Sequence, residues 1–201
     1  MSTLSSGPYV GAMTERSEPT QLDDREITAL RRLIDRAAIT ECVHRYARGL
    51  DRRDAELVAS AYHANAVEDH GQYVGGLDGL VAYLMDVHAP FSGYQRHVTT
   101  QNIDIDGDAA HAESYFISVI RIDGTEKLRL TGGRYVDRLE RRDGEWRIAE
   151  RVVVLEWYGA VPGGGIDPAI QVAPRLDQDD VSYARPLQVT RDRREPPSRQ
   201  G

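Results

Sequence analysis

The sequence predicts an α+β fold in which helices pack on one face of a curved, mostly antiparallel sheet. Apolar residues recur at three- and four-residue spacing in the N-terminal part of the chain, and the period changes to two after Pro90. The helical part therefore precedes the strand part instead of alternating with it, which is typical of α+β proteins. A chain of 201 residues is long enough for one domain that encloses a small-molecule pocket.

Three helices are predicted before Pro90. The first, roughly Asp24–Gly49, has apolar residues at helical spacing and a glycine as its plausible end. Asp54 is predicted to cap the second helix and Asp78 the third, because a short carboxylate side chain accepts hydrogen bonds from unpaired amides of the first turn. A short strand over about Val67–Tyr73 separates these two helices.

Four long strands are predicted after the helices, because β-branched and aromatic residues are frequent there and Asp-Gly pairs mark the turns. The expected strands are Arg96–Asp104, Ala109–Ile122, Lys127–Arg141 and Glu145–Trp157. Short turns join consecutive strands, so neighbours in sequence are expected to pair antiparallel.

The predicted domain covers residues 24–157 and lies between two segments of different composition. Residues 1–23 are rich in Ser, Thr, Gly, Pro and Glu, which predicts a flexible N-terminal arm. Residues 158–201 contain six of the nine prolines and little periodicity. They are predicted to form an extended C-terminal tail, either free or lying on the core or on a neighbouring subunit.

Composition narrows the classes of function. The net charge of −7 and the lack of a long basic run argue against nucleic-acid binding. The longest apolar run is far shorter than the ~20 residues that a membrane span needs, and residues 1–19 lack the features of a signal peptide, so the expected location is the cytoplasm. Cys42 is the only cysteine, and no histidine pair has metal-ligand spacing, so neither a metal nor another cofactor is expected.

Several residues are hard to explain as ordinary core or surface positions. Arg151 is a charge among apolar residues of the last strand, and Trp157 shares its strand face. His97 and Thr99 share one polar face of an earlier strand. Asp51 follows the first helix, where the helix dipole disfavours a carboxylate.

Two further residues are candidates for the same pocket. Tyr46 precedes Asp51 by five residues on the first helix, and His70 is the best additional histidine. Each residue also has a plainer explanation. Tyr46 is an ordinary core residue and Asp51 a loop acid in that case, and His97 lies on an exposed edge of the sheet. Arg151 then pairs with a carboxylate for structural reasons or extends to solvent. If the residues converge, a carboxylate orients a histidine as general base, and a phenol and a guanidinium stabilise negative charge.

The order of the elements resembles the SnoaL-like branch of the NTF2-like superfamily of cone-shaped α+β barrels. Residues 39–54 resemble the opening helix of that branch and its aspartate, and residues 132–148 resemble its final hairpin, with a GG-x-Y…DG-x-W pattern. The resemblance covers about Asp24–Trp157. It implies a cone-shaped barrel with three N-terminal helices packed on the sheet.

The branch includes scytalone dehydratase, bile-acid 7α-dehydratase and hexachlorocyclohexane dehydrochlorinase, lyases that share an Asp–His dyad. The resemblance places this dyad on Asp51 and His97, the tyrosine of the bile-acid enzyme on Tyr46 and the arginine of the dehydrochlorinase on Arg151. These four are the expected catalytic residues. The expected substrate-binding residues are His70, Thr99 and Trp157.

The resemblance thus implies a cofactor-independent lyase, either a dehydratase or an HX-eliminating enzyme. Its expected substrate is small and largely apolar, such as a steroid, terpenoid, polyketide or aromatic intermediate. An isomerase or cyclase with the same dyad, or a non-catalytic small-molecule-binding module, is the alternative, because fold does not choose among them. A homo-oligomer, trimer or dimer, is also expected.

Overall fold

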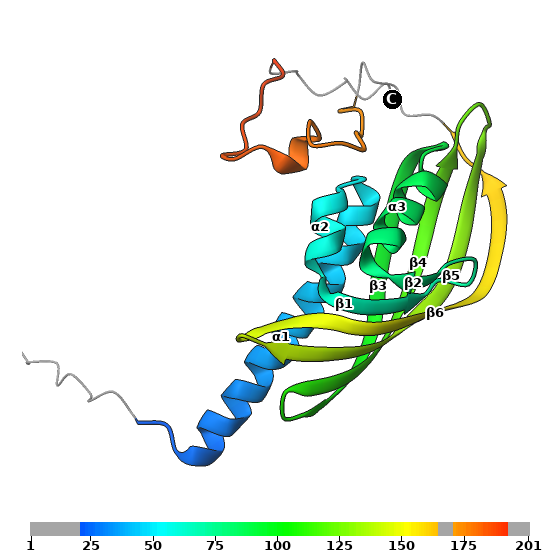
Figure 1. Ribbon diagram of the computed structural model, residues 1–201. Coiled ribbons are helices and arrows are strands. Elements are labelled where there is room, and N and C mark those ends of the chain that lie inside the picture. The colour runs from blue at the N-terminus through cyan, green and yellow to red at the C-terminus, as the bar shows by residue number, and fades with distance from the viewer. Residues whose placement is uncertain (1–20, 165–170, 193–201) are drawn as a thin grey trace, which may run out of the picture.

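Six strands form one curved, open sheet with the order β2-β1-β6-β5-β4-β3 in the computed structural model, which describes residues 21–164 and 171–192 (Figure 1). The strands are β1 (Tyr62–Asp69), β2 (Val74–Gly76), β3 (Phe91–Asp106), β4 (Ala109–Ile122), β5 (Lys127–Arg142) and β6 (Glu145–Pro162). β1 pairs with β6 in parallel, and all other pairs are antiparallel. The α+β class is confirmed, although the sheet does not close into a barrel.

Three helices lie on the concave side of this sheet, namely α1 (Asp24–Asp51), α2 (Ala55–Ser60) and α3 (Leu77–His88). Asp23 and Glu26 form a reciprocal capping box at the start of α1, and Asp54 caps α2 as predicted. The predicted cap at Asp78 is wrong: Gly76 is the N-cap residue of α3, and Asp78 lies in its first turn.

The segment between α2 and α3 also differs from the prediction. Instead of one strand over Val67–Tyr73, β1 begins at Tyr62 and a turn separates it from the short strand β2. The residues Tyr62–Ala66 alternate poorly between apolar and polar, so the periodicity does not reveal this strand. Its pairing with β6 is what orders it.

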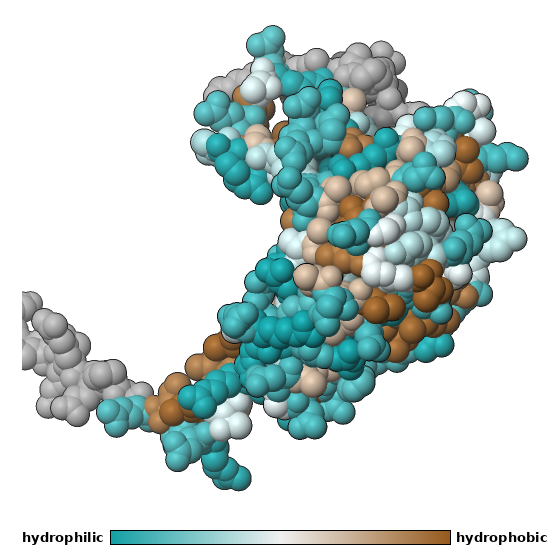
Figure 2. All heavy atoms as spheres, viewed as in Figure 1, coloured by the Kyte–Doolittle hydropathy of each residue, from teal (hydrophilic) through white to brown (hydrophobic). Residues whose placement is uncertain are grey.

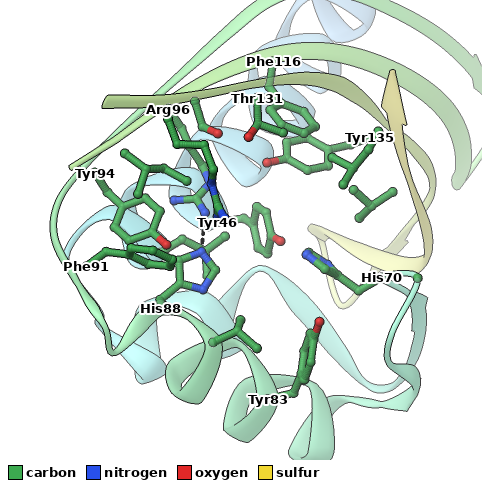
Figure 3. A pocket seen from close by; sticks show the side chains of 18 of the residues that line it. Tyr46, His70, Tyr83, His88, Phe91, Tyr94, Arg96, Phe116, Thr131 and Tyr135 are labelled. Carbon is green, nitrogen blue, oxygen red and sulfur yellow. Dashed lines mark hydrogen bonds between the residues drawn. The ribbon is translucent and has the colours of Figure 1, made fainter. Parts of the chain in front are cut away.

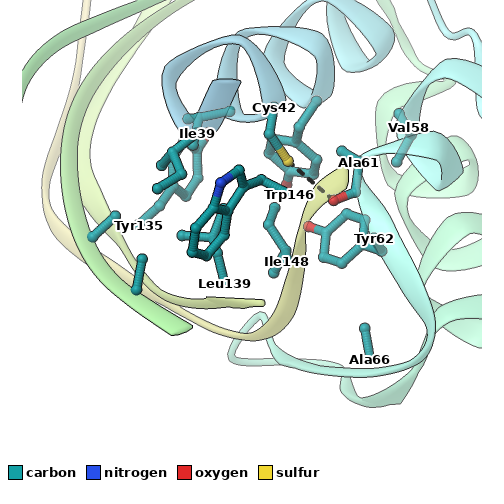
Figure 4. Close-up of a cluster of buried hydrophobic side chains, with 14 of the residues drawn as sticks. Ile39, Cys42, Val58, Ala61, Tyr62, Ala66, Tyr135, Leu139, Trp146 and Ile148 are labelled. Carbon is teal, nitrogen blue, oxygen red and sulfur yellow. Dashed lines mark hydrogen bonds between the residues drawn. The ribbon is translucent and has the colours of Figure 1, made fainter. Parts of the chain in front are cut away.

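The hydrophobic core lies between the C-terminal half of α1 and the sheet (Figure 4). Ile39 and Cys42 of α1 pack towards Leu139, Trp146 and Ile148 of β5 and β6, and all five side chains are buried. The Cys42 thiol donates to the carbonyl of Ala61, and burial raises its pKa to about 11. Cys42 is therefore a small core residue rather than a reactive thiol.

The N-terminal half of α1 projects beyond the sheet (Figures 1 and 2). Leu30, Leu33 and Ile34 are exposed there, and Figure 2 shows hydrophobic residues along this part of the helix. At the other end of the chain, residues 171–192 contain only one short 3-10 helix, Val181–Tyr183. The predicted arm 1–23 lies outside the described residues except for residues 21–23.

Candidate active site

A cavity of about 510 Å³ lies between α1, α3 and the concave face of the sheet (Figure 3). Its wall is rich in aromatic rings, and its polar groups come from separate elements. The ionisable or hydroxyl-bearing residues that matter below are Tyr46, His70, His88, Tyr94, Arg96 and Arg129. A volume of this size suits a small organic molecule.

A buried carboxylate orients the histidine at one side of the cavity. His70 follows β1, and its Nδ1 lies 2.5 Å from Oε1 of Glu68, whose side chain is fully buried. The other oxygen of Glu68 accepts from the hydroxyl of Tyr62. Donation from Nδ1–H to the carboxylate leaves the lone pair of Nε2 available as a base, and Figure 3 shows the His70 ring pointing into the cavity towards Tyr46.

Sequence reasoning selected His70 but missed Glu68. The signal was available, since residues two apart on a strand share one face, and Glu68 and His70 have that spacing. The predicted strand Val67–Tyr73 held both residues, but only the histidine was selected, because nothing in the sequence marks Glu68 as buried.

Tyr46 presents an unpaired hydroxyl in the middle of the cavity. Its side chain is buried, and its hydroxyl has no hydrogen-bond partner among the described residues. Tyr62 and Tyr135 pack edge-on against its ring at centroid distances of 5.7 and 5.4 Å. Burial raises the pKa of Tyr46 well above its ordinary value, so the phenol keeps its proton at neutral pH. The group is a buried donor that none of the described residues uses.

Asp51 does not hold a histidine; it holds Arg96. Its two oxygens accept from the Arg96 backbone amide and from Nη1, at 2.8 and 2.7 Å. Nη2 of Arg96 donates to Nε2 of His88, whose Nδ1 donates to the carbonyl of Leu84. His88 is thus fixed as a neutral acceptor, and burial together with the charge of Arg96 lowers its pKa to about 3.

Arg151 lies beneath the cavity rather than in its wall. It is fully buried and makes two hydrogen bonds, of 2.6 and 2.7 Å, to the carboxylate of Asp137. Its guanidinium lies 4.3 Å from the centroid of the Tyr46 ring and 4.2 Å from that of Tyr135. Burial raises the pKa of Asp137, and the charge of Arg151 opposes that rise. Arg151 therefore packs its guanidinium against the ring of Tyr46 from beneath the cavity.

A protein-family model for the SnoaL-like domain matches residues 31–152, which is more than half of the chain. The chain belongs to the SnoaL-like domain family. The matched region begins within α1 and ends within β6, so it contains all the residues of the site described above.

Solved structures with the same fold include enzymes. A proposed scytalone dehydratase from Novosphingobium aromaticivorans is 20% identical, with a TM-score of 0.60 over 68% of this chain and 97% of its own. A hexachlorocyclohexane dehydrochlorinase from Novosphingobium barchaimii is 21% identical, with a TM-score of 0.61 over 70% and 99%. A protein of unknown function from Mycobacterium tuberculosis is 25% identical, with a TM-score of 0.57 over 64% and 75%. None of the curated proteins matches the sequence.

The expected Asp51–His97 dyad of this SnoaL-like domain is not formed. Arg96, not His97, points from β3 towards the cavity, because successive strand residues face opposite sides. The His97 side chain is exposed and makes no hydrogen bond to Asp51, although both residues border a depression on the outside of the domain. His97 and Thr99 share one polar face of β3, as predicted, but that face is the outer face of the sheet.

Two expected substrate-binding residues also lie away from the cavity. Thr99 is exposed beside His97, and Trp157 is 46% exposed, with its ring covering Gly132. The bulge between Gly132 and Gly133 changes the register of β6, which a strict two-residue alternation does not anticipate. Of the seven expected residues, the cavity wall contains Tyr46 and His70.

Within residues 21–164 and 171–192, no three His, Cys, Asp or Glu side chains group as metal ligands. None of the helices described is long and apolar enough to cross a membrane.

Proposed function

We propose that this SnoaL-like protein is a lyase, of dehydratase or HX-eliminating type, that transfers protons with its own side chains. One observation carries the proposal: the Glu68–His70 pair and the unpaired Tyr46 hydroxyl face the same cavity. The largely aromatic and aliphatic wall fits a small, mostly apolar substrate of the steroid, terpenoid, polyketide or aromatic type.

The pair supplies a base with a defined tautomer. Nε2 of His70 removes a proton from a carbon next to a carbonyl group, and the nearby Glu68 carboxylate stabilises the imidazolium that forms. The electron pair of the broken C–H bond forms the new double bond as the C–O bond to the leaving hydroxyl breaks. Tyr46 donates its proton to that hydroxyl, which leaves as water, and the proton on His70 then returns through solvent to the phenolate.

Two of the predicted catalytic residues lie outside the cavity wall but contact residues that line it. Asp51 positions Arg96 by a two-point contact, and Arg151 holds the ring of Tyr46 against the cavity wall. His97, Thr99 and Trp157 have no contact with the cavity and take no part. In this proposal, Glu68 and His70 take the roles that the family resemblance assigned to Asp51 and His97.

Turnover of a simple β-hydroxy ketone tests the proposal. The aldol adduct of acetone and benzaldehyde loses water to a conjugated enone that is followed by ultraviolet absorbance. His70→Gln is expected to lower kcat by about a hundredfold or more, because a positioned base contributes about that much. Tyr46→Phe is expected to lower kcat by about a hundredfold, with unchanged melting temperature, because it removes only an unpaired hydroxyl.

His97→Gln is the matched control, since that histidine lies on the outer face, and its kcat is expected to stay within about twofold of wild type. Full turnover by His70→Gln would refute the assignment. Deuterium uptake from D₂O at the α-carbon without loss of water would indicate an isomerase-type reaction by the same base.

We also propose a homo-oligomer, trimer or dimer, and a cytoplasmic location. Sedimentation equilibrium measures the first, and a monomer at micromolar concentration would exclude it.

A further inference from the structure

Arg129 is a cation in the cavity wall that no carboxylate of the described residues neutralises. It lies on β5, on the same strand face as Thr131, and both residues line the cavity. Its Nε is buried without a hydrogen-bond partner, and none of the ion pairs among the described residues includes Arg129. By contrast, Arg96 pairs with Asp51 and Arg151 pairs with Asp137.

Partial burial and aromatic neighbours make an uncompensated charge at Arg129 unfavourable. Its guanidinium lies 5.0 Å from the centroid of the Phe91 ring, and Tyr94 lies in the same part of the wall. A donor buried without a partner costs free energy, whereas an aromatic face offsets only a part of that cost. An anionic group of a ligand would supply the missing acceptor.

The charged residues near Arg129 add to the preference of this end of the cavity for an anionic group. Arg53 donates to the carbonyls of His88, Ala89 and Phe91, so a third guanidinium lies at this end of the cavity. Arg53, Arg96 and Arg129 all favour the ionised form of Tyr94, but burial dominates and raises its pKa to about 12. Asp51 pairs with Arg96, whereas no ion pair among the described residues includes Arg53 or Arg129, so the positive charge is in excess.

This end of the cavity is separate from the proposed base. Figure 3 shows His70 and Tyr83 on one side, Phe91, Tyr94 and His88 on the other, and Tyr46 between them. A ligand anchored near Phe91 can therefore extend past Tyr46 to His70.

We propose that the substrate carries a carboxylate and that Arg129 binds it, as the residue that determines specificity. This inference rests on the proposed lyase function, which it deepens by assigning the substrate class. The planar guanidinium matches the two oxygens of a carboxylate, and the apolar wall accepts the rest of the molecule. Binding at Arg129 leaves the reacting carbon to Tyr46 and His70.

Equilibrium binding of two matched probes tests the inference. The probes are naphthalene-2-carboxylate and its uncharged amide, which have nearly the same shape, and calorimetric titration measures their dissociation constants. The carboxylate is expected to bind wild-type protein about tenfold or more tightly than the amide, as expected for a hydrogen-bonded charge pair. Arg129→Met is expected to remove this preference and leave amide binding unchanged.

Three further variants complete the design. Arg129→Lys keeps the charge without the planar fork, and an intermediate preference is expected. Arg147→Met removes a partly exposed arginine that pairs with Glu145 outside the cavity, and its preference should equal that of wild type. His70→Gln should also retain the preference, because it alters only the proposed base.

Equal affinities of the two probes for wild-type protein, or equal weakening of both by Arg129→Met at an unchanged melting temperature, would overturn the inference. These outcomes separate it from the lyase proposal. A preference lost in Arg129→Met with full turnover by His70→Gln would leave the carboxylate site standing and the base refuted. The opposite pattern would leave the base standing and the carboxylate site refuted.

Discussion

Two histidines that line the same cavity play different parts in this domain because their neighbours differ. His70 has a carboxylate beside Nδ1, whereas His88 has a carbonyl beside Nδ1 and the Arg96 guanidinium at Nε2. Both contacts of His88 require the neutral ring with its proton on Nδ1. His88 therefore orients Arg96 and is no proton-transfer group, although it borders the same cavity as His70.

The low pKa of His88 predicts a pH-dependent stability. The unfolded chain binds a proton near the ordinary pKa of about 6.5, whereas the folded protein does so only near about 3. The stabilisation is therefore complete above pH 6.5 and is lost as pH falls towards 3. Between pH 6.5 and 4.5 the loss is expected to be roughly 2 kcal/mol.

Urea unfolding of wild type and His88→Gln at several pH values measures this loss. Gln cannot titrate, so its free energy of unfolding should fall less between pH 6.5 and 4.5 than that of wild type. The carboxylates titrate in both proteins and contribute equally to both curves of unfolding free energy against pH. The difference between the two curves therefore gives the contribution of His88. Parallel curves would contradict the assigned pKa.

At the scale of elements, close approach of β5 and β6 explains the paired glycines of the final hairpin. A Cβ at Gly133 would overlap the carbonyl oxygen of Val154 on β6, at the bulge where the register shifts. A Cβ at Gly132 would meet only the half-exposed ring of Trp157. Gly133 is thus restricted by the backbone of β6, whereas Gly132 is restricted only by a side chain that has room to move.

Gly133→Ala is expected to destabilise the domain by about 1–3 kcal/mol, the usual cost of overpacking, because the backbone of β6 must move. Chemical denaturation measures the effect. Gly159→Ala is the matched control on β6, since no atom lies within 4 Å of the added methyl group. Equal stability of the two variants would show that β5 and β6 separate freely at the bulge.

At the scale of the whole molecule, residues 171–192 attach to the end of the helical layer. The hydroxyl of Tyr183 donates to Asp54 at 2.8 Å, and Arg52 lies 3.4 Å from Asp180. The backbone amides of Ser182 and Arg175 donate to Asp180, and these hydrogen bonds are among the causes that lower its pKa to about 2, against the effect of burial. Asp54 also caps α2, so the tail and the helix share one carboxylate.

Deletion of residues 171–201 is therefore expected to lower the melting temperature by roughly 3–12 °C, because a hydrogen bond to a charged group is worth about 1.5–3 kcal/mol. Deletion of residues 193–201 is the control, and differential scanning fluorimetry compares the two. The same melting temperature for both truncations would mean that the contacts of Tyr183 and Asp180 add nothing to stability.

Local chemistry made much of the fold predictable. Asp54 before α2, the Asp-Gly turns and the alternating strands act over a few residues, and each appears in the structure. β1 was only partly predicted, because its order depends on a parallel partner, β6, far away in sequence. The α3 cap was misplaced because the start of that helix follows from the β2 turn rather than from a capping side chain.

The sequence by itself determined the α+β class, the SnoaL-like hairpin and the presence of Tyr46 and His70 in a cavity. Tertiary structure alone decided which carboxylate meets which cation or histidine. Asp51 pairs with Arg96, and Glu68 pairs with His70. The physical reason is strand phase: one residue of register separates the inner face from the outer one, and only packing against the helices selects the inner face.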